Sequence, residues 1–191
     1  MPNDHQHACR TLVASISLLS LILPAGLHAG RQDAKPIALT KDPVVARVYE
    51  HLGDQPKPLV LVVDHERFSP AVWRRVKNLI AFRLHRPLEG GGTQVDAAVY
   101  LVRTSQLYAK AEAVLRNRTT NDGYVWCLLA AVLTHEAAHR TPDTEREALA
   151  AEASQLRQCL FAGHLYSSSG WSAGDYLQKV EAKLRDPRPV H

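Results

Sequence analysis

Residues 134–152 read THEAAHRTPDTEREALAAE and join two predicted helices. The first helix, over 124–140, is apolar until its last turns, and Pro142 ends it. The second helix begins at once, because Thr144 and Glu147 have the spacing of a capping box. Since the turn between them is so short, the two helices are predicted to pack side by side as an antiparallel hairpin. This hairpin carries most of the functional information in the sequence.

Two histidines stand four residues apart near the end of the first helix, His135 and His139. Residues at that spacing share one helix face, so both imidazoles can bind one Zn²⁺ ion. The carboxylate of Glu136 can take a proton from metal-activated water and deliver it to a leaving amine. HEAAH in an apolar helix therefore matches the H-E-x-x-H pattern of zinc hydrolases. The alternative is a solvated helix end, but the apolar turns before the histidines favour a semi-buried site, where unpaired polar groups are costly.

Two cysteines support the same hairpin. Cys127 and Cys159 lie at equal distances before and after residue 143, the middle of the turn. An antiparallel pair of helices therefore brings them opposite one another, and the sequence predicts a disulfide between them. The alternative is a pair of free buried thiols.

A zinc site with two histidines and a water needs one more protein ligand. Glu145, Glu147 and Glu152 follow the histidines and compete for that role. Helix positions advance by about 100° per residue, measured here from the expected cysteine contact. Glu145 and Glu152 then fall on the side of the histidines, whereas Glu147 points away. The angles leave the choice between Glu145 and Glu152 open.

The stretches LTHEAAH and TEREALAAE resemble the gluzincin branch of the zincin metallopeptidases, especially minimal forms whose third ligand opens an E-x-x-A stretch one helix downstream. The resemblance covers about residues 95–160. Position by position, it implies the zinc ligands His135, His139 and Glu145, with Glu136 as the general base. The loop between His139 and Glu145 is shorter than is usual in gluzincins.

The other segments predict a small α+β domain over 59–191, zincin-like and mostly helical, with a short sheet beside the HExxH helix. Runs of β-branched residues indicate the strands, and near-helical spacing of apolar residues indicates the helices. The predicted elements are strands over 59–63 and 95–102, and helices over 69–86, 104–118 and 175–185. The resemblance implies that the strand at 95–102 holds a substrate backbone at its edge by strand addition.

The amino terminus predicts an exported protein. Residues 1–29 combine a polar start, an apolar core and Ala29 as a cleavage point, which is typical of a signal peptide; a retained anchor helix is the alternative. Residues 30–58 are rich in Pro, Lys and Asp, and we expect a linker or N-terminal extension, with a small helix after Pro43 as an alternative. The mature chain is expected in the periplasm or outside the cell, with no contact with a membrane after signal removal.

The function predicted is an exported zinc metallopeptidase that acts on a peptide or protein substrate. The net charge of +4 is spread along the chain without a long basic run, so nucleic acid is not an expected partner. Two other hypotheses remain: a non-catalytic zincin-fold binding or scaffold protein in the periplasm, and a helical protein without metal. Candidate donors to an oxyanion are His164, Tyr166 and Tyr176.

Overall fold

The computed structural model describes residues 42–88, 91–117, 123–141, 144–161 and 173–186. The predicted signal peptide and residues 30–41 of the predicted extension lie outside these ranges, as do His164 and Tyr166.

Strands and helices are mixed in the first part of the described chain, and only helices follow. In chain order the elements are α1 (Pro43–Leu52), β1 (Leu59–Val63), η2 (His65–Arg67), α2 (Pro70–Val76), β2 (Ala81–Phe82), β3 (His85–Pro87), β4 (Thr93–Val95), β5 (Ala98–Val102), α3 (Gln106–Asn117), α4 (Gly123–Ala138), α5 (Glu145–Phe161) and α6 (Ala173–Arg185). The predicted class, a small α+β domain with a short sheet beside the HExxH helix, is confirmed.

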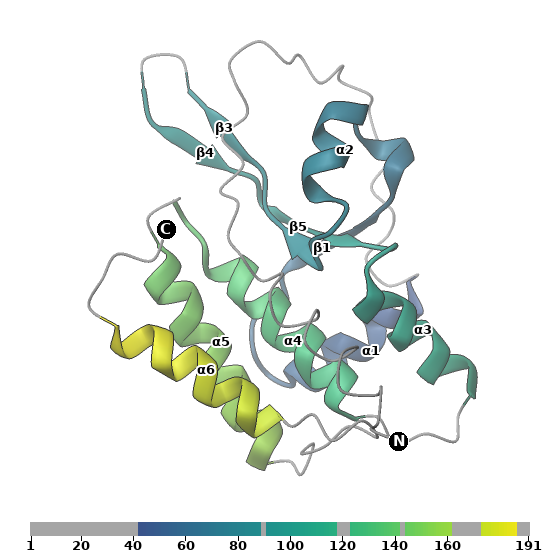
Figure 1. Ribbon diagram of the computed structural model, residues 1–191, viewed down its shortest axis with the longest axis vertical. Helices are drawn as coiled ribbons and strands as arrows, with labels where there is room; N and C mark the ends of the chain where they lie inside the picture. The colour runs from purple at the N-terminus through teal and green to yellow at the C-terminus, as the bar shows by residue number, and fades with distance from the viewer. Residues whose placement is uncertain (1–41, 89–90, 118–122, 142–143, 162–172, 187–191) are drawn as a thin grey trace, which may run out of the picture.

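The main sheet has the order β1-β5-β2. Strand β5 pairs in parallel with β1, from Leu59 opposite Ala98 to Val63 opposite Val102, and antiparallel with β2. Strands β3 and β4 form a separate antiparallel ribbon that projects from the sheet (Figure 1). The β-branched run of β1 suits its position, because most of its side chains are buried between helices.

The helices lie in layers around this sheet (Figure 1). Helix α2 packs on one face of the sheet, through a cluster that includes Val72, Val76 and Phe82. Helices α1, α3 and α4 pack on the other face and form the largest core. Helices α5 and α6 cover the far side of α4. Helix α4 is therefore enclosed on all sides, which explains why its first three turns are apolar all round.

The predicted helix over 69–86 is wrong beyond Val76. Its start is as expected, because Ser69 accepts a hydrogen bond from the amide of Val72 at 3.4 Å and Pro70 follows. After Val76 the chain enters the sheet, and the carbonyl of Ile80 accepts from the amide of Val102 at 2.9 Å. Pairing with β5 thus overrides the helical spacing of the apolar residues.

The predicted strand over 95–102 is two strands in the structure, separated by Asp96 and Ala97. Strand β5 has β1 on one side and β2 on the other. The expectation that this strand offers a free edge to a substrate is therefore wrong for residues 100–102, which pair with β1 on one side and with residues 80–82 on the other.

Residues 43–52, placed by the sequence in a linker or a small helix, form α1 and pack into the core. The carboxylate of Asp42 caps the helix by accepting from the amides of Val44 and Val45, each at 3.0 Å. Gly53, at φ 58°, ends the helix in a conformation that favours glycine. The packed domain thus starts before residue 59.

Helices α4 and α5 form the predicted hairpin, and a disulfide joins Cys127 to Cys159 with a Cα–Cα distance of 5.7 Å. The predicted capping box is wrong. The Thr144 hydroxyl instead accepts from the amides of Arg140 and Thr141, at 2.9 and 3.3 Å, and so stabilises the turn itself.

We expect reduction of this disulfide to lower the melting temperature by on the order of 10 °C. The bond closes a loop with a sequence separation of 32 residues, for which the chain-entropy model gives about 3–4 kcal/mol. Thermal unfolding monitored by circular dichroism, with and without a phosphine reductant, measures the shift. The double variant Cys127→Ala/Cys159→Ala serves as a control, since the reductant should leave its melting curve unchanged. An unshifted wild-type curve together with two titratable thiols would contradict the prediction.

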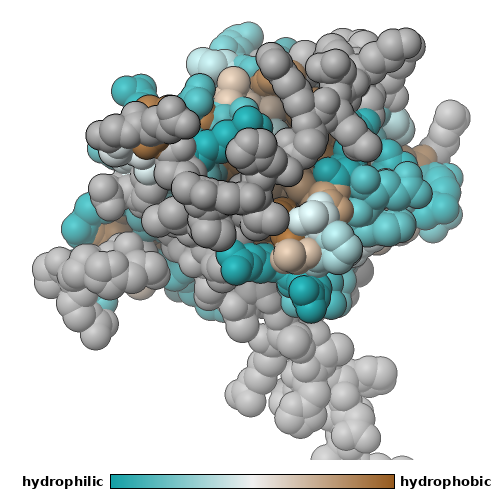
Figure 2. Space-filling view, turned by 90° about the horizontal axis from the view of Figure 1, so that it is seen from above, coloured by the Kyte–Doolittle hydropathy of each residue, from teal (hydrophilic) through white to brown (hydrophobic). Residues whose placement is uncertain are grey.

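The described surface carries few large hydrophobic side chains; Leu59, Leu88 and Phe161 are the exposed ones. Figure 2 shows hydrophilic residues over much of the described part of one face, with hydrophobic residues in small areas between them. Among the described helices, none has both the length and the hydropathy needed to cross a membrane.

Candidate metal centre

The centre is built where α4 ends and α5 begins. His135 lies in the last turn of α4, His139 directly after that helix, and Glu145 is the first residue of α5. All three residues are buried, with 4%, 6% and 3% of their surface exposed. The short turn of the hairpin places Glu145 opposite the two histidines. The residues predicted from the sequence are therefore brought together at one point.

Three ligand atoms converge in this centre. The Nε2 atoms of His135 and His139 are 3.2 Å apart. Glu145 Oε2 lies 3.6 Å from Nε2 of His135 and 3.4 Å from Nε2 of His139. This trio could hold a metal ion, because all its ligand atoms lie within 4.8 Å of one another.

Glu145 supports a cation at this position. Both of its carboxylate oxygens are buried and have no hydrogen-bond partner among the described residues. A carboxylate in such surroundings is costly unless a positive charge compensates it. A divalent ion, or protonated imidazoles, would supply that charge.

Glu152 lies on the opposite side of His135 from Glu145. Its Oε2 is 2.9 Å from Nδ1 of His135, and its Oε1 accepts a hydrogen bond of 2.6 Å from the hydroxyl of Tyr176 on α6. Because Glu152 accepts at Nδ1, the proton of the neutral imidazole is held there and Nε2 keeps its lone pair for a metal. Glu152 is 1% exposed, so the whole chain of contacts is shielded from water.

The charges of the centre shift the pKa values of two of its groups. Burial lowers the pKa of His135, but the hydrogen bond with Glu152 and its charge outweigh burial and leave the pKa raised. Burial also raises the pKa of Tyr176, and the negative charge of Glu152 raises it further. Tyr176 therefore stays protonated and can only donate to Glu152. Its hydroxyl is committed to this contact, which argues against the predicted role as an oxyanion donor.

Glu136 follows His135 on α4 and is half-buried. Burial raises the pKa of its carboxyl, while the nearby His135 and His139 oppose the shift. A carboxyl group beside the two histidines is placed to accept and donate protons at a metal bound there. Glu147, by contrast, is exposed on the outer face of α5, as its helical angle predicted.

Glu145 and Glu152 differ in their position along the axis of α5, whereas their angles around that axis are too similar to distinguish them. Seven residues of helix bring a side chain back to nearly the same face but move it about 10 Å along the axis. Glu145 consequently reaches Nε2 of both histidines, and Glu152 reaches only Nδ1 of His135. The role of Tyr176 beside Glu152 had no signal in the sequence, because α6 docks through a tertiary contact.

Arg83 was also missed by the sequence. This residue lies between β2 and β3, and its guanidinium donates to the carbonyls of Ala137 and His139 at 3.2 and 2.6 Å. It also donates to the carbonyls of Asp96 and Ala97, at 2.9 and 3.3 Å. Arg83 thus attaches the end of the histidine helix to the sheet, and its positive charge suits the helix C-terminus.

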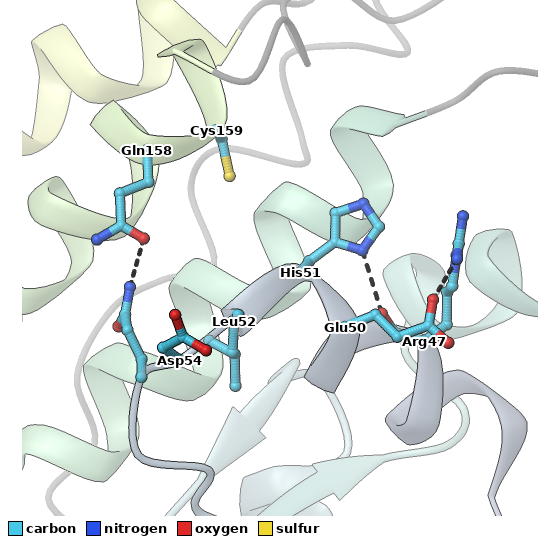
Figure 3. Close-up of a pocket in the computed structure, with 9 residues that line it drawn as sticks. Arg47, Glu50, His51, Leu52, Asp54, Gln158 and Cys159 are labelled. Atoms are coloured by element: carbon cyan, nitrogen blue, oxygen red, sulfur yellow. Dashed lines mark hydrogen bonds and ion pairs between the residues drawn. The ribbon is translucent and has the colours of Figure 1, made fainter.

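A separate cavity of about 780 Å³ lies between the ends of α1 and α5. Figure 3 shows Gln158 and Cys159 on one side of this cavity and the end of α1, with His51 and Leu52, on the other. Gln158 is thirteen residues from Glu145 along α5, or about 20 Å. The cavity is therefore remote from the candidate metal centre.

We expect Glu152→Gln to weaken Zn²⁺ binding about 10- to 100-fold, because partners of this kind orient the metal-ligating histidine and raise its basicity. Tyr176→Phe removes one hydrogen bond from Glu152 and should weaken binding in the same direction by a smaller factor. Competition with a fluorescent chelator measures both affinities. Tyr49→Phe is the matched control, since its hydroxyl bonds to the remote carbonyl of Pro58. Equal affinities in all four proteins would show that the contact with His135 has no part in metal binding.

Comparison with known proteins adds no family assignment to this geometry. No protein-family model matches the chain, and neither a curated protein nor a solved structure does so. The chemistry of the centre is therefore argued from its own side chains.

Proposed function

We propose that this protein is an exported zinc metallopeptidase that hydrolyses peptide bonds in a peptide or protein substrate. The observation that carries the proposal is the convergence of His135, His139 and Glu145 in one buried group, with Glu136 beside it. Two imidazoles and one carboxylate are the protein ligands of many catalytic zinc sites, in which the fourth position is left for water or substrate.

The spacing of the ligand atoms supports zinc. Atoms bound tetrahedrally at zinc distances of about 2.0–2.1 Å lie about 3.4 Å from one another. The three separations in this centre are 3.2, 3.4 and 3.6 Å. The Glu145 carboxylate, which has no hydrogen-bond partner among the described residues, and the contact of Glu152 with His135 Nδ1 agree with the same interpretation.

The chemistry of a bound zinc ion is to lower the pKa of water and to polarise a carbonyl group. Glu136 accepts the proton of the attacking water and delivers it to the nitrogen of the leaving amine, so that one side chain acts first as base and then as acid. Glu152 and Tyr176 keep His135 in one tautomer throughout.

The disulfide supports export. A bond between Cys127 and Cys159 is stable in an oxidising compartment such as the periplasm or the extracellular space. The predicted signal peptide at 1–29 points to the same destination.

One observation favours a second function, a non-catalytic metal-containing binding or scaffold protein. The three candidate ligands are almost fully enclosed. A metal ion held at such depth can stabilise a fold without turnover, as structural zinc sites do. Hydrolysis separates the two functions, because both predict bound zinc and only the peptidase cleaves.

The test begins with the purified chain lacking residues 1–29. Elemental analysis by mass spectrometry is expected to find one zinc ion per chain. Incubation with a diverse peptide library, followed by mass spectrometry of the products, is expected to show cleavage that a chelator stops and added Zn²⁺ restores. Bound zinc without any cleavage would favour the scaffold function, and a chain that takes up no zinc would refute both.

A further inference from the structure

The segment from β2 into β3 alternates between two environments. Phe82 and Leu84 point to the side of α2 and belong to the cluster packed there. Ala81 belongs to the core shared with α4, on the opposite face. Since successive side chains in an extended chain point to opposite faces, residues 81, 83 and 85 face the helix layer that contains the metal centre.

The contacts of Arg83 show which part of α4 lies beside the row formed by residues 81, 83 and 85. Ala81 packs in the α4 core, and Arg83 reaches the carbonyls of Ala137 and His139 at the very end of that helix. His85 comes next in the row, about 6–7 Å further along the chain. Its place is therefore beyond the end of α4, on the side of His139.

His85 is a buried histidine whose hydrogen-bonding capacity is not fully used. It is 4% exposed, as enclosed as His139, and its Nδ1 atom has no hydrogen-bond partner among the described residues. Burial lowers the pKa of His85, and the neighbouring His139 and Arg83 lower it further. In either protonation state the ring has at least one N–H to donate. A buried polar group without a partner is costly, and such groups call for an explanation.

His85 does not belong to the group of atoms that could hold the metal. That group consists of His135, His139 and Glu145. An imidazole near such a group, but outside it, can hydrogen-bond to a molecule bound at the metal. His85 is near enough to His139 for the two groups to interact electrostatically.

We propose that His85 is a substrate-binding residue of the metal centre, whose imidazole donates a hydrogen bond to the oxygen of the peptide carbonyl under attack. This inference rests on the proposed peptidase function. The hydrogen bond strengthens as negative charge develops on that oxygen, so it stabilises the transition state more than the bound substrate. Arg83 is the positioning residue, since its bonds to both the helix end and the residues after β4 hold β3 over the centre.

The test compares zinc-loaded wild type with His85→Ala, His85→Gln and the control His65→Ala, whose histidine is exposed on η2. On the best-cleaved peptide, His85→Ala is expected to lower kcat about 100- to 1,000-fold with little change in KM. His85→Gln keeps an N–H donor and should recover part of the loss. Zinc content and melting temperature should match the wild type in all variants. Unchanged kcat in His85→Ala, or loss of zinc together with activity, would overturn the assignment.

A binding measurement separates this inference from the proposed function. A phosphinic peptide carries charged oxygens that resemble the oxyanion, and calorimetry gives its affinity for each zinc-loaded protein. We expect His85→Ala to bind it at least 10-fold more weakly than wild type and His65→Ala. If wild type binds zinc but cleaves nothing, the peptidase proposal fails, and this affinity ratio still decides the role of His85. Equal affinity in wild type and His85→Ala, or no binding to wild type, would refute that role.

Discussion

Glu136→Gln is expected to lower the rate of peptide hydrolysis by about 10²- to 10⁴-fold while one zinc ion per chain remains bound. Glutamine has nearly the shape of glutamate but cannot accept a proton from water or return it to an amine. Zinc should stay because Glu136 is not among the three candidate ligands. Steady-state hydrolysis of the best library peptide and elemental analysis of the same sample measure the two quantities together.

The matched control for this variant is Glu147→Gln. Glu147 is exposed on the outer face of α5, so the same chemical change there should leave the rate within about twofold of wild type. A Glu136→Gln protein that retains full activity would show that another group is the base. Loss of zinc from the Glu136→Gln protein would instead show that the Glu136 side chain helps to hold the metal.

Glu145→Ala is expected to weaken Zn²⁺ binding by more than about 100-fold, the upper end of the effect of removing a residue that only orients a ligand. The variant removes one of three ligand atoms and leaves two imidazoles, whereas catalytic zinc sites have three protein ligands. Zinc affinity is measured by chelator competition, as for Glu152→Gln, so that the two results can be compared on one scale.

Three glutamates of α5 give this experiment an internal order. Glu145 faces both histidine Nε2 atoms, Glu152 contacts only Nδ1 of His135, and Glu147 is exposed. We expect the loss of affinity to be largest for Glu145→Ala, intermediate for Glu152→Gln and absent for Glu147→Ala. A larger loss at Glu152 than at Glu145 would exchange their roles, and equal retention in all three would remove the ligand assignment.

The elements that could be predicted from the sequence share one property: their signal is local or symmetric. Two histidines four residues apart on an apolar helix must share a face, whatever surrounds them. Cys127 and Cys159 could be paired because they are equally far from a turn that forces two helices together. The α+β class followed from separate apolar runs of strand and helix type.

The predictions that failed depended on contacts between distant segments. The apolar residues after Val76 have near-helical spacing, yet residues 80–82 pair with β5 in the sheet. Strand β5 became the central strand because β1 and β2 pair with it from both sides. Such pairing is decided by the whole fold, since the intrinsic preference of a short apolar segment for helix or strand is weak.

By itself, the sequence determined the helix hairpin, the histidine pair with its neighbouring glutamate, and the disulfide that clamps the two helices. Each residue of an α-helix is rotated by about 100° from the one before, and this rotation was sufficient to predict which of these side chains share a face. Only the tertiary structure decided which glutamate lies level with both histidines, that Tyr176 donates to Glu152, and that Arg83 bonds to the end of α4. Those relations depend on where separate elements are placed along and across one another, and packing of the complete core sets that placement.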